Sequence, residues 1–365
     1  MPLCPLPSWH PPSLGATFYL EAWKRKQVQV ATHWGMTGYE QEEQERPEFA
    51  NMAELNNFSR ISPVTGKPEH HFPEAKKTSL LIRSWTIVST FIVLVGSAIV
   101  ACFALRAYLS HPAPYGRVYL QYGNDDEQTL ALGSIIGSIL NAVQIQIMNA
   151  IYQSVADSLT EAENHRTETA FEDALISKTF SFQFVNSYMS LIYVAFIKQA
   201  LAILGGFENR CVPNCMAELS TSLGIIFITN ITVGNVTEVI IPYYTSLKKM
   251  KEERERAVMR TETDIPPLTN VERQFMKIEY DVLKGTFQDY SEMIIQFGYC
   301  TLFVVAYPLS VVLAVVNNYI EIRVDAWKLC QSHRRPYPVS AEDIGTWQSF
   351  LELMSTLAVM SNMVT

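Results

Sequence analysis

Long apolar stretches alternate with polar and basic segments through most of this chain, which predicts helices that span a membrane. A membrane-spanning helix needs about 20 apolar residues. The uncharged stretch 293–320 holds 28 residues, more than one span needs, so Pro308 is predicted to mark a tight turn between two helices. The seven predicted spans are residues 85–105, 130–155, 180–204, 217–247, 282–306, 309–328 and 344–365.

The distribution of basic residues predicts how these spans are oriented. Lys and Arg are frequent before the first span, after the fourth and after the sixth, whereas loops 110–129 and 205–217 hold one Arg each. Because short loops rich in Lys and Arg stay in the cytosol, residues 1–78 are predicted to form a cytosolic segment. The acidic segment 157–178 falls on the same side, since acids contribute little to this rule. Residues 79–365 then form an all-α, polytopic helical membrane domain.

Composition and short motifs argue against several function classes. The net charge of −8 makes nucleic acid an improbable partner. The chain contains no GxGxxG, P-loop, HExxH or nucleophile-elbow motif, so we expect no enzymatic activity.

Acidic residues inside the predicted spans are the strongest functional signal. Glu238 lies in the fourth span, Asp289 and Glu292 open the fifth, and Glu321 and Asp325 close the sixth. At 1.5 Å per residue all of them fall in the cytosolic half at a similar depth. The spacings of three and four residues place each pair on one face of its helix. A carboxylate inside a membrane is costly and usually has a partner, which predicts one shared site.

A hard metal ion is the predicted partner of these acids. No Lys or Arg is expected at their depth except Arg323, which lies between the last pair and points off their face. Oxygen ligands without His or Cys suit a hard cation, above all Ca²⁺. The alternative is that the pairs in the fifth and sixth spans are wetted helix ends at the membrane surface.

Several long segments resemble one known family. The most specific are "FQFVNSYMSLIYVAFIK", "DYSEMIIQFGYCTLF" and "VVNNYIEIRVDAWKL". They resemble the anoctamins, also called the transmembrane-16 family, and look most like its fungal members. The resemblance covers about residues 16–365 and leaves residues 1–15 unmatched. It implies an incomplete chain that holds roughly helices three to nine of the family fold.

The resemblance implies two Ca²⁺ ions bound between three helices. The implied ligands are Glu238, Asp289, Glu292, Glu321 and Asp325. Many members place an Asn four residues before the first of these, where this chain has Gly234 followed by Asn235. A slip of one residue turns a side chain by about 100°, so Asn235 contributes only through a distorted turn, which Gly234 permits. Gly234 and Pro242 are also predicted bending points, although Pro242 alternatively just ends an apolar stretch.

The function implied by the resemblance is Ca²⁺-activated phospholipid scrambling, in which lipid head groups slide along a membrane-facing groove. Polar residues near helical spacing are predicted to line that groove: Ser138, Asn141, Gln144, Tyr193 and Lys198. The alternative for this stripe is hydrogen bonding between helices inside the bundle. Lys198 is harder to explain in that way, because a lysine inside a membrane tends to line water or a head-group path.

Other functions stay open at the level of sequence. The same groove in a closed form implies a Ca²⁺-activated chloride or other ion channel. Membrane acids also serve cation-coupled transporters, and some fungal relatives tether the endoplasmic reticulum to the plasma membrane. The expected partners are membrane phospholipids, chloride or other ions, and a second copy of the chain in a homodimer. The expected location is the plasma membrane or cortical endoplasmic reticulum. The family has paired cysteines where Cys211 and Cys215 stand, which implies disulfides either between these two or with cysteines outside this chain.

Overall fold

A computed structural model describes residues 11–63, 66–110, 119–120, 130–198, 215–261 and 269–364. Helices form nearly all of the regular structure in these ranges, which confirms the predicted all-α class. The described strands form two small antiparallel hairpins. Strand β1 (Ser59–Ile61) pairs with β2 (Pro68–His70), and β3 (Tyr119–Leu120) pairs with β4 (Leu130–Ala131).

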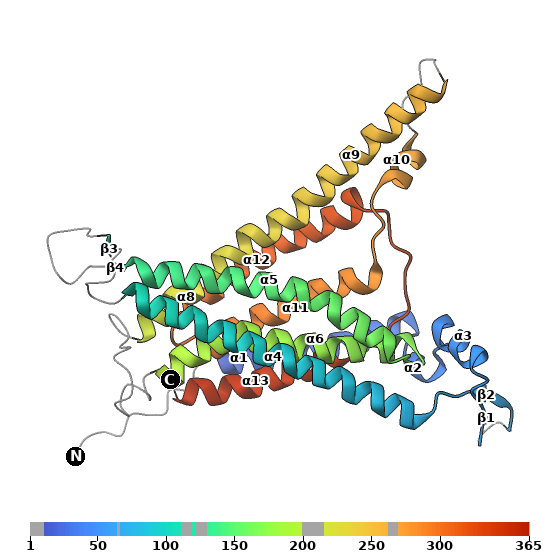
Figure 1. The fold of residues 1–365 in the computed structure, drawn as a ribbon, viewed down its shortest axis with the longest axis horizontal. Helices are drawn as coiled ribbons and strands as arrows, with labels where there is room; N and C mark the ends of the chain where they lie inside the picture. Colours follow the sequence, from blue (N-terminus) through green and yellow to red (C-terminus); the bar gives the residue numbers. More distant parts are fainter. Residues whose placement is uncertain are drawn as a thin grey trace.

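The first part of the described chain holds three short to medium helices and three long ones. The N-terminal helices are α1 (Pro11–Trp34), α2 (Tyr39–Glu42) and α3 (Pro47–Leu55). The long helices are α4 (Glu74–Ser110), α5 (Leu132–Ala162) and α6 (Glu168–Ile192), which a π-helical turn η1 (Tyr193–Ile197) extends. Helices α4, α5 and α6 run side by side along the molecule (Figure 1).

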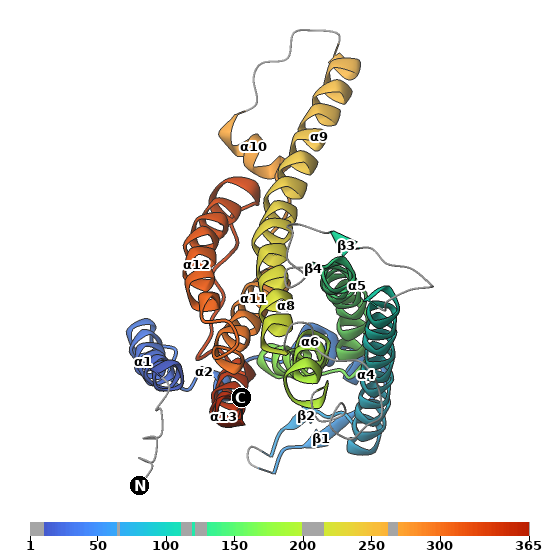
Figure 2. The same ribbon diagram turned by 90° about the vertical axis from the view of Figure 1, so that its left-hand side faces the viewer.

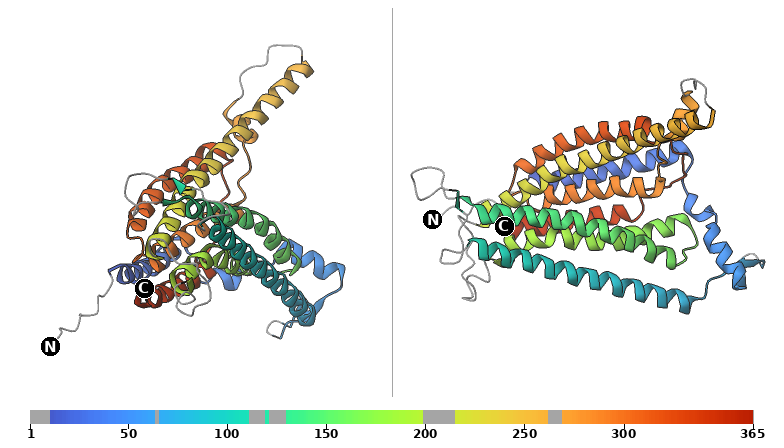
Figure 3. Two further views of the ribbon diagram at one scale, coloured as in Figure 1. Left: turned by 60° about the vertical axis from the view of Figure 1, so that its left-hand side comes forward. Right: turned by 45° about the horizontal axis from the view of Figure 1, so that its top comes forward.

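The second part begins with one continuous helical rod. It consists of α8 (Cys215–Thr229), the π-helical turn η2 (Asn230–Gly234) and α9 (Asn235–Thr261). The rest is α10 (Asn270–Met276), α11 (Val282–Leu302), α12 (Leu309–Trp327), the π-helical turn η3 (Lys328–Ser332) and α13 (Thr346–Val364). Helix α9 projects beyond the bundle with α10 beside it (Figure 2). The axes of the other long helices are roughly aligned, as the right-hand view of Figure 3 shows.

Several helices extend well beyond the stretches that hydropathy marks. Helix α6 begins at Glu168, whereas the apolar stretch begins at residue 180. The side chain of Thr167 accepts a hydrogen bond from the backbone N–H of Ala170, and Glu168 suits the positive end of the helix dipole. Hydropathy identifies only the apolar part of a helix, so it does not detect a polar first turn that is stabilised by a cap. The last residues of the third predicted span, 199–204, lie outside the described part.

Four described helical stretches are long and apolar enough to cross a membrane, by length and composition. They are Glu74–Leu105, Ile135–Ala162, Glu168–Ile197 and Cys215–Arg256. Helices α11 and α12 carry the acidic pairs, which lowers their hydropathy. Large apolar side chains face outward from three elements, for example Val93 on α4, Ile241 on α9 and Val315 on α12. Such outward apolar surface is what a helix shows to lipid. The number of spans, seven, stays a prediction.

Helix α6 lies at the centre of the packed core. Its Phe182 stacks on Tyr152 of α5, with ring centroids 3.9 Å apart. On another face its Phe180 meets Trp347 of α13 edge-on at 6.0 Å. Both Phe180 and Phe182 are fully buried. Because α6 is anchored on both sides, it provides a fixed wall against which α11 can pack.

A buried charge cluster closes the turn between α5 and α6. The ammonium of Lys178 donates to Glu163 Oε2 at 2.7 Å, and His165 Nε2 lies 2.8 Å from the same oxygen. Burial alone would raise the pKa of the Glu163 carboxyl, but hydrogen bonds from His165, Lys178 and Ser84 outweigh it and hold that pKa below its usual value. The cluster fixes how the two helices meet at the end of the bundle that also holds α2 and α3 (Figure 1).

Candidate metal centre

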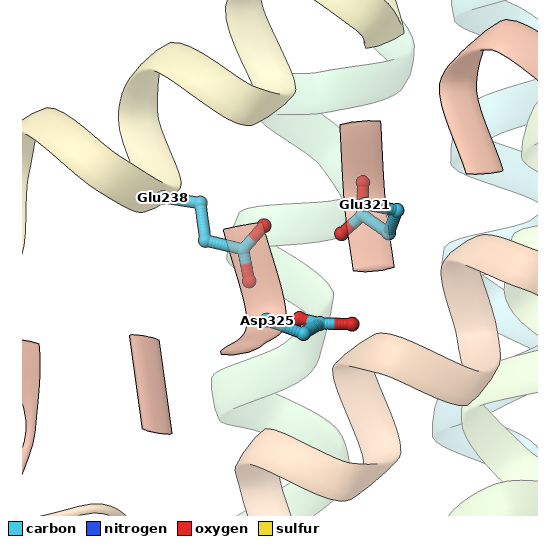
Figure 4. Close-up of side chains that lie close together, drawn as sticks. All are labelled: Glu238, Glu321 and Asp325. Carbon is cyan, nitrogen blue, oxygen red and sulfur yellow. The ribbon is translucent and has the colours of Figure 1, made fainter. Parts of the chain in front are cut away.

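Three helices bring carboxylates from distant parts of the sequence to one place. Glu238 lies in the first turn of α9, whereas Glu321 and Asp325 lie one turn apart on α12. One oxygen from each of these three carboxylates lies within 4.8 Å of the others. Figure 4 shows the Glu238 side chain reaching from its helix toward the other two. The arrangement concentrates negative charge between α9 and α12.

Helix α11 brings the remaining two predicted acids to the same place. Asp289 joins the cluster through a lysine ammonium that it shares with Glu238. Glu292, one turn further along α11, is close enough to Glu238, Asp289 and Asp325 to interact with them electrostatically. The structure therefore gathers all five predicted acids between α9, α11 and α12, although no described contact joins Glu292 directly to another acid.

A lysine lies among these acids, contrary to the sequence-based expectation that no protein cation reaches them. The Nζ atom of Lys328 contacts Glu238 Oε1, lies 2.7 Å from Asp289 Oδ1 and lies 2.9 Å from Asp325 Oδ1. Its side chain is only 8% exposed. The expectation was wrong because Lys328 was counted with the loop that follows the sixth span. Its four-carbon stem reaches back along the helix instead.

The sequence contained a signal for one of these contacts, the one between Lys328 and Asp325. Lys328 follows Asp325 by three residues and Glu321 by seven, which places all three on one helical face. Arg323, the basic residue that the sequence analysis did consider, is exposed and stacks on the ring of Tyr319 instead. Spacing relative to the acids was therefore a better guide than the predicted end of the span.

A layer of amide side chains lies next to the acids; Asn235 was predicted there, whereas Asn317 and Gln296 were not. Asn317, one turn before Glu321, donates to Gln296 Oε1 at 2.9 Å. Asn235 Nδ2 lies 3.5 Å from Asn317 Oδ1 and donates to the carbonyl of Ile231 at 3.0 Å. Its own amide oxygen is buried and accepts no hydrogen bond from the described residues. Asn235 thus has an uncommitted oxygen close to α12, although no contact with the acids is recorded for it.

The turn that precedes Asn235 is distorted. Residues Asn230–Gly234 form a π-helical turn, which adds one residue to the regular helical repeat. Pro242 lies inside α9, and because proline has no N–H it cannot donate to the carbonyl of Glu238. Both features loosen the backbone around Glu238. The roles of Gly234 and Pro242 as hinges stay predictions.

The chemistry of this centre fits a hard divalent ion. It combines carboxylate oxygens from three helices, and Glu321 Oε2 is buried without a hydrogen bond from any described residue. Ca²⁺ prefers six to eight oxygen ligands, mostly carboxylates and amide or backbone carbonyls. The five acids would hold such an ion, with the amide oxygen of Asn235 as a further ligand.

The segment before α11 covers one side of the centre. The hydroxyl of Tyr280 lies 3.5 Å from Asp289 Oδ2, and the Tyr280 ring meets His333 edge-on at 5.8 Å. Ile278 pairs with His333 as an isolated bridge. The segment before α11 therefore contacts the segment that follows η3, next to Asp289.

A cavity of 440 Å³ adjoins the acids between α5, α6, α11 and the α8–η2 rod. Glu292 and Gly234 belong to its wall. Its other polar lining residues are Gln146, Asn149, Gln153, Gln183, Ser187, Asn230, Gln288, Ser291 and Tyr299. No Lys or Arg is among the described residues that line it. The cavity therefore combines an amide-rich wall with one carboxylate of the metal centre.

The five predicted groove residues lie elsewhere and contact neighbouring helices. Ser138 bonds to Ser222 at 3.1 Å, Asn141 donates to Ser190 at 3.1 Å and Gln144 donates to Asn186 at 2.9 Å. Tyr193 packs on Phe103, with ring centroids 4.6 Å apart. These contacts match the alternative of interhelical hydrogen bonding for the α5 stripe. Another face of α5 turns to the cavity.

Lys198 is paired rather than free. Its ammonium lies 2.8 Å from both carboxylate oxygens of Glu218, and the Lys198 and Glu218 side chains are 5% and 3% exposed. The pair links the end of the α6–η1 helix to the start of α8. Nearby, Cys215 is disulfide-bonded. Cys211 lies outside the described residues, so its pairing with Cys215 stays a prediction.

Comparisons with known proteins agree with this architecture. Residues 12–365 match the family described as "Anoctamin: Calcium-activated chloride channel". Anoctamin-7 of Rattus norvegicus is 34% identical over 364 residues, which cover 96% of this chain and 40% of that protein. Anoctamin-5 of Mus musculus is 31% identical, with 95% and 39% covered, and anoctamin-4 of Bos taurus is 33% identical, with 95% and 38% covered. The chain spans about 40% of the length of these curated relatives.

Proposed function

The chain belongs to the anoctamin family, an integral multi-pass membrane family, and from this premise we propose that it forms part of a Ca²⁺-activated phospholipid scramblase. The proposal rests on one observation: a polar cavity shares a wall with an acidic metal centre. Glu292 belongs to both the wall and the charge cluster. A switch and a path that share a residue can be coupled directly.

Bound Ca²⁺ would supply the positive charge that lets these carboxylates lie close together. Glu238 would then be held against the acids of α11 and α12, and the first turn of α9 would follow it. The adjoining η2 turn, which ends at Gly234 on the cavity wall, would move with that turn. Ca²⁺ would favour the open path only as far as it binds more tightly to that arrangement.

The cavity wall favours lipid head groups over free anions. A path for chloride needs positive charge or hydrogen-bond donors aimed at an anion, and a nearby carboxylate opposes it. The described wall offers amides and Glu292 but no Lys or Arg, and Lys198 is committed to Glu218. Amides can serve both the phosphate and the ammonium group of a zwitterionic lipid, since they donate and accept. The family description names a chloride channel, so ion conduction is the second candidate.

Lipid transport in liposomes tests the proposal. We would reconstitute the 365-residue chain, and the same chain joined to the flanking segments of a longer relative, with labelled phospholipid. Dithionite should destroy more than the outer-leaflet fluorescence when Ca²⁺ is present, and only the outer-leaflet share when it is chelated. Ca²⁺-dependent chloride flux without lipid loss would favour the channel. Flux that requires a cation gradient and ignores Ca²⁺ would favour a transporter.

The cellular setting is proposed from the resemblance alone. We expect the plasma membrane or the cortical endoplasmic reticulum, and we expect two copies of the completed chain to form a homodimer. Closeness to fungal members stays a prediction, and a tethering role stays an alternative.

A further inference from the structure

We propose that Lys328 is a built-in competitor of Ca²⁺: its ammonium and one metal ion use the same carboxylate oxygens, so the ion enters only when the lysine leaves. The inference rests on the proposed Ca²⁺ site and adds a determinant of its sensitivity. It follows from where the lysine lies and from what its three partners are.

The contacts of Lys328 are those that a metal ion would make. The Nζ atom touches one oxygen each from Glu238, Asp289 and Asp325, which come from α9, α11 and α12 respectively. A Ca²⁺ ion lies 2.3–2.6 Å from its oxygen ligands, so an ion on these three oxygens would occupy nearly the position of Nζ. The two cations cannot share that position.

The ammonium of Lys328 has two opposite electrostatic effects on the site. Like-charged, partly buried carboxylates without a counter-charge are unfavourable, so the ammonium stabilises the three acids when no other cation is bound. The same ammonium repels an approaching divalent ion, and at a partly desolvated position this repulsion is stronger than in bulk water. Lys328 therefore both stabilises the metal-free centre and lowers the apparent affinity of the centre for Ca²⁺.

The backbone at Lys328 is suited to release its side chain. Helix α12 ends at Trp327, and Lys328 begins the π-helical turn η3. Such turns are locally looser than an α-helix and are frequent at functional sites. Beyond the turn, the backbone N–H of His333 donates to the carbonyl of Lys328 at 3.0 Å, so the backbone would stay anchored when the side chain leaves the three acids.

The apparent affinity measures this competition. If a site is open for only a fraction of the time, its apparent dissociation constant rises by the inverse of that fraction. Replacing Lys328 by methionine removes the charge, keeps a linear apolar stem of similar length and adds no oxygen ligand. Arg323→Met is the matched control, because it removes one positive charge from an exposed position of the same helix.

The experiment is isothermal titration of Ca²⁺ into the purified 365-residue chain in nanodiscs, together with melting temperatures in Ca²⁺ and in chelator. We expect Lys328→Met to tighten Ca²⁺ binding about tenfold or more, which corresponds to a site that Lys328 leaves open about a tenth of the time. It should also lower the melting temperature in chelator. Arg323→Met should change the affinity less than about twofold, because surface charges are screened. Lys328→Arg keeps the charge and should not tighten binding.

The outcomes separate this inference from the proposed function. Equal Ca²⁺ affinity in the unmodified chain and in Lys328→Met overturns the competition and leaves the Ca²⁺ site intact. Equal tightening by Arg323→Met also overturns it, because a general charge effect would then suffice. Binding seen only after Lys328→Met supports it in the strongest form. If neither protein binds Ca²⁺, the metal centre itself is refuted, and the inference is refuted with it.

Discussion

At the scale of single residues, the contacts of each acid indicate its role. Glu238 contacts Lys328 and shares a 4.8 Å cluster with Glu321 and Asp325, so it links α9 to α12. Glu163, by contrast, is held by Lys178 and His165, and none of these three residues lines the cavity. The first environment fits a ligand, and the second fits a structural anchor.

Loss of the Glu238 charge should weaken the Ca²⁺ response. In Glu238→Gln the amide keeps the shape but removes one negative ligand, so we expect the Ca²⁺ concentration for half-maximal lipid scrambling to rise at least about tenfold. Glu255→Gln, at an exposed position of the same helix, is the control and should leave the response unchanged. An unchanged Ca²⁺ dependence in Glu238→Gln would remove Glu238 from the site.

Loss of the Glu163 charge should destabilise the fold instead. Glu163→Gln leaves the Lys178 ammonium buried beside a neutral amide, which typically costs about 3–5 kcal/mol of unfolding free energy. Because the folded pKa of Glu163 is depressed, this contribution is complete at neutral pH and fades as the pH falls through that depressed value, below 4.5.

Thermal unfolding in detergent between pH 7 and pH 3 measures this effect, because the loss begins only near the unfolded pKa of about 4.5. The difference in melting temperature between Glu163→Gln and the unmodified chain should shrink as the pH falls. Glu161→Gln is the matched control, because Glu161 is exposed two residues away. If Glu163→Gln melts like that control at pH 7, the buried pair contributes nothing to stability.

At the scale of helices, two glycines on neighbouring elements have opposite surroundings. A methyl group at Gly298 of α11 would overlap the hydroxyl of Tyr188 on α6 and the terminal carbon of Met354 on α13. A methyl group at Gly234 would meet nothing within 4 Å. Gly298 therefore permits a close approach of three helices, whereas Gly234 matters only through backbone freedom.

These two positions predict different phenotypes for the same substitution. Gly298→Ala should destabilise the chain by about 1–3 kcal/mol, because the packed α6–α11–α13 contact must open. Gly234→Ala should keep the melting temperature or raise it slightly, because alanine favours helix more than glycine does. If the η2 turn is a hinge, Gly234→Ala should still shift the Ca²⁺ concentration for scrambling. Unchanged Ca²⁺ dependence would argue against the hinge.

At the scale of the whole molecule, the cavity and the metal centre share Glu292, but the rest of the cavity wall comes from residues outside the metal centre. The cavity lies between α5, α6, α11 and the α8–η2 rod, and the charges lie between α9, α11 and α12. Helix α11 belongs to both groups. A change on the far wall should therefore alter transport without altering Ca²⁺ binding.

A double substitution on α5 tests this separation. Asn149→Leu with Gln153→Leu makes part of the cavity wall apolar, and a head group that loses one hydrogen-bond partner faces a barrier higher by about 1–2 kcal/mol. We expect scrambling at saturating Ca²⁺ to slow about tenfold, with Ca²⁺ affinity by calorimetry unchanged. Gln144→Leu is the control, because Gln144 also hydrogen-bonds to Asn186, as Asn149 does, but does not line the cavity. Equal slowing by the control would place the path elsewhere.

The sequence determined the helices and the charge chemistry of this protein, because both depend on local patterns. Apolar stretches gave the approximate positions of the long helices, and the turn expected at Pro308 lies between α11, which ends at Leu302, and α12, which begins at Leu309. The spacing of the acidic pairs placed each pair on one helix face, and oxygen ligands without His or Cys indicated a hard cation. Capped polar turns such as the one at Thr167 were missed, since hydropathy does not register them.

The tertiary structure decided which face of each helix meets which neighbour. Ser138 and Asn141 hydrogen-bond to other helices and do not line the cavity, whereas Gln146 and Gln153, on the same helix, line it. Periodicity identifies a polar face but not its partner, because the packing angle between helices sets it. For the same reason only the folded chain shows that Lys328 reaches acids contributed by α9 and α11. Its distance from them along the chain, 90 and 39 residues, gave no indication of that contact.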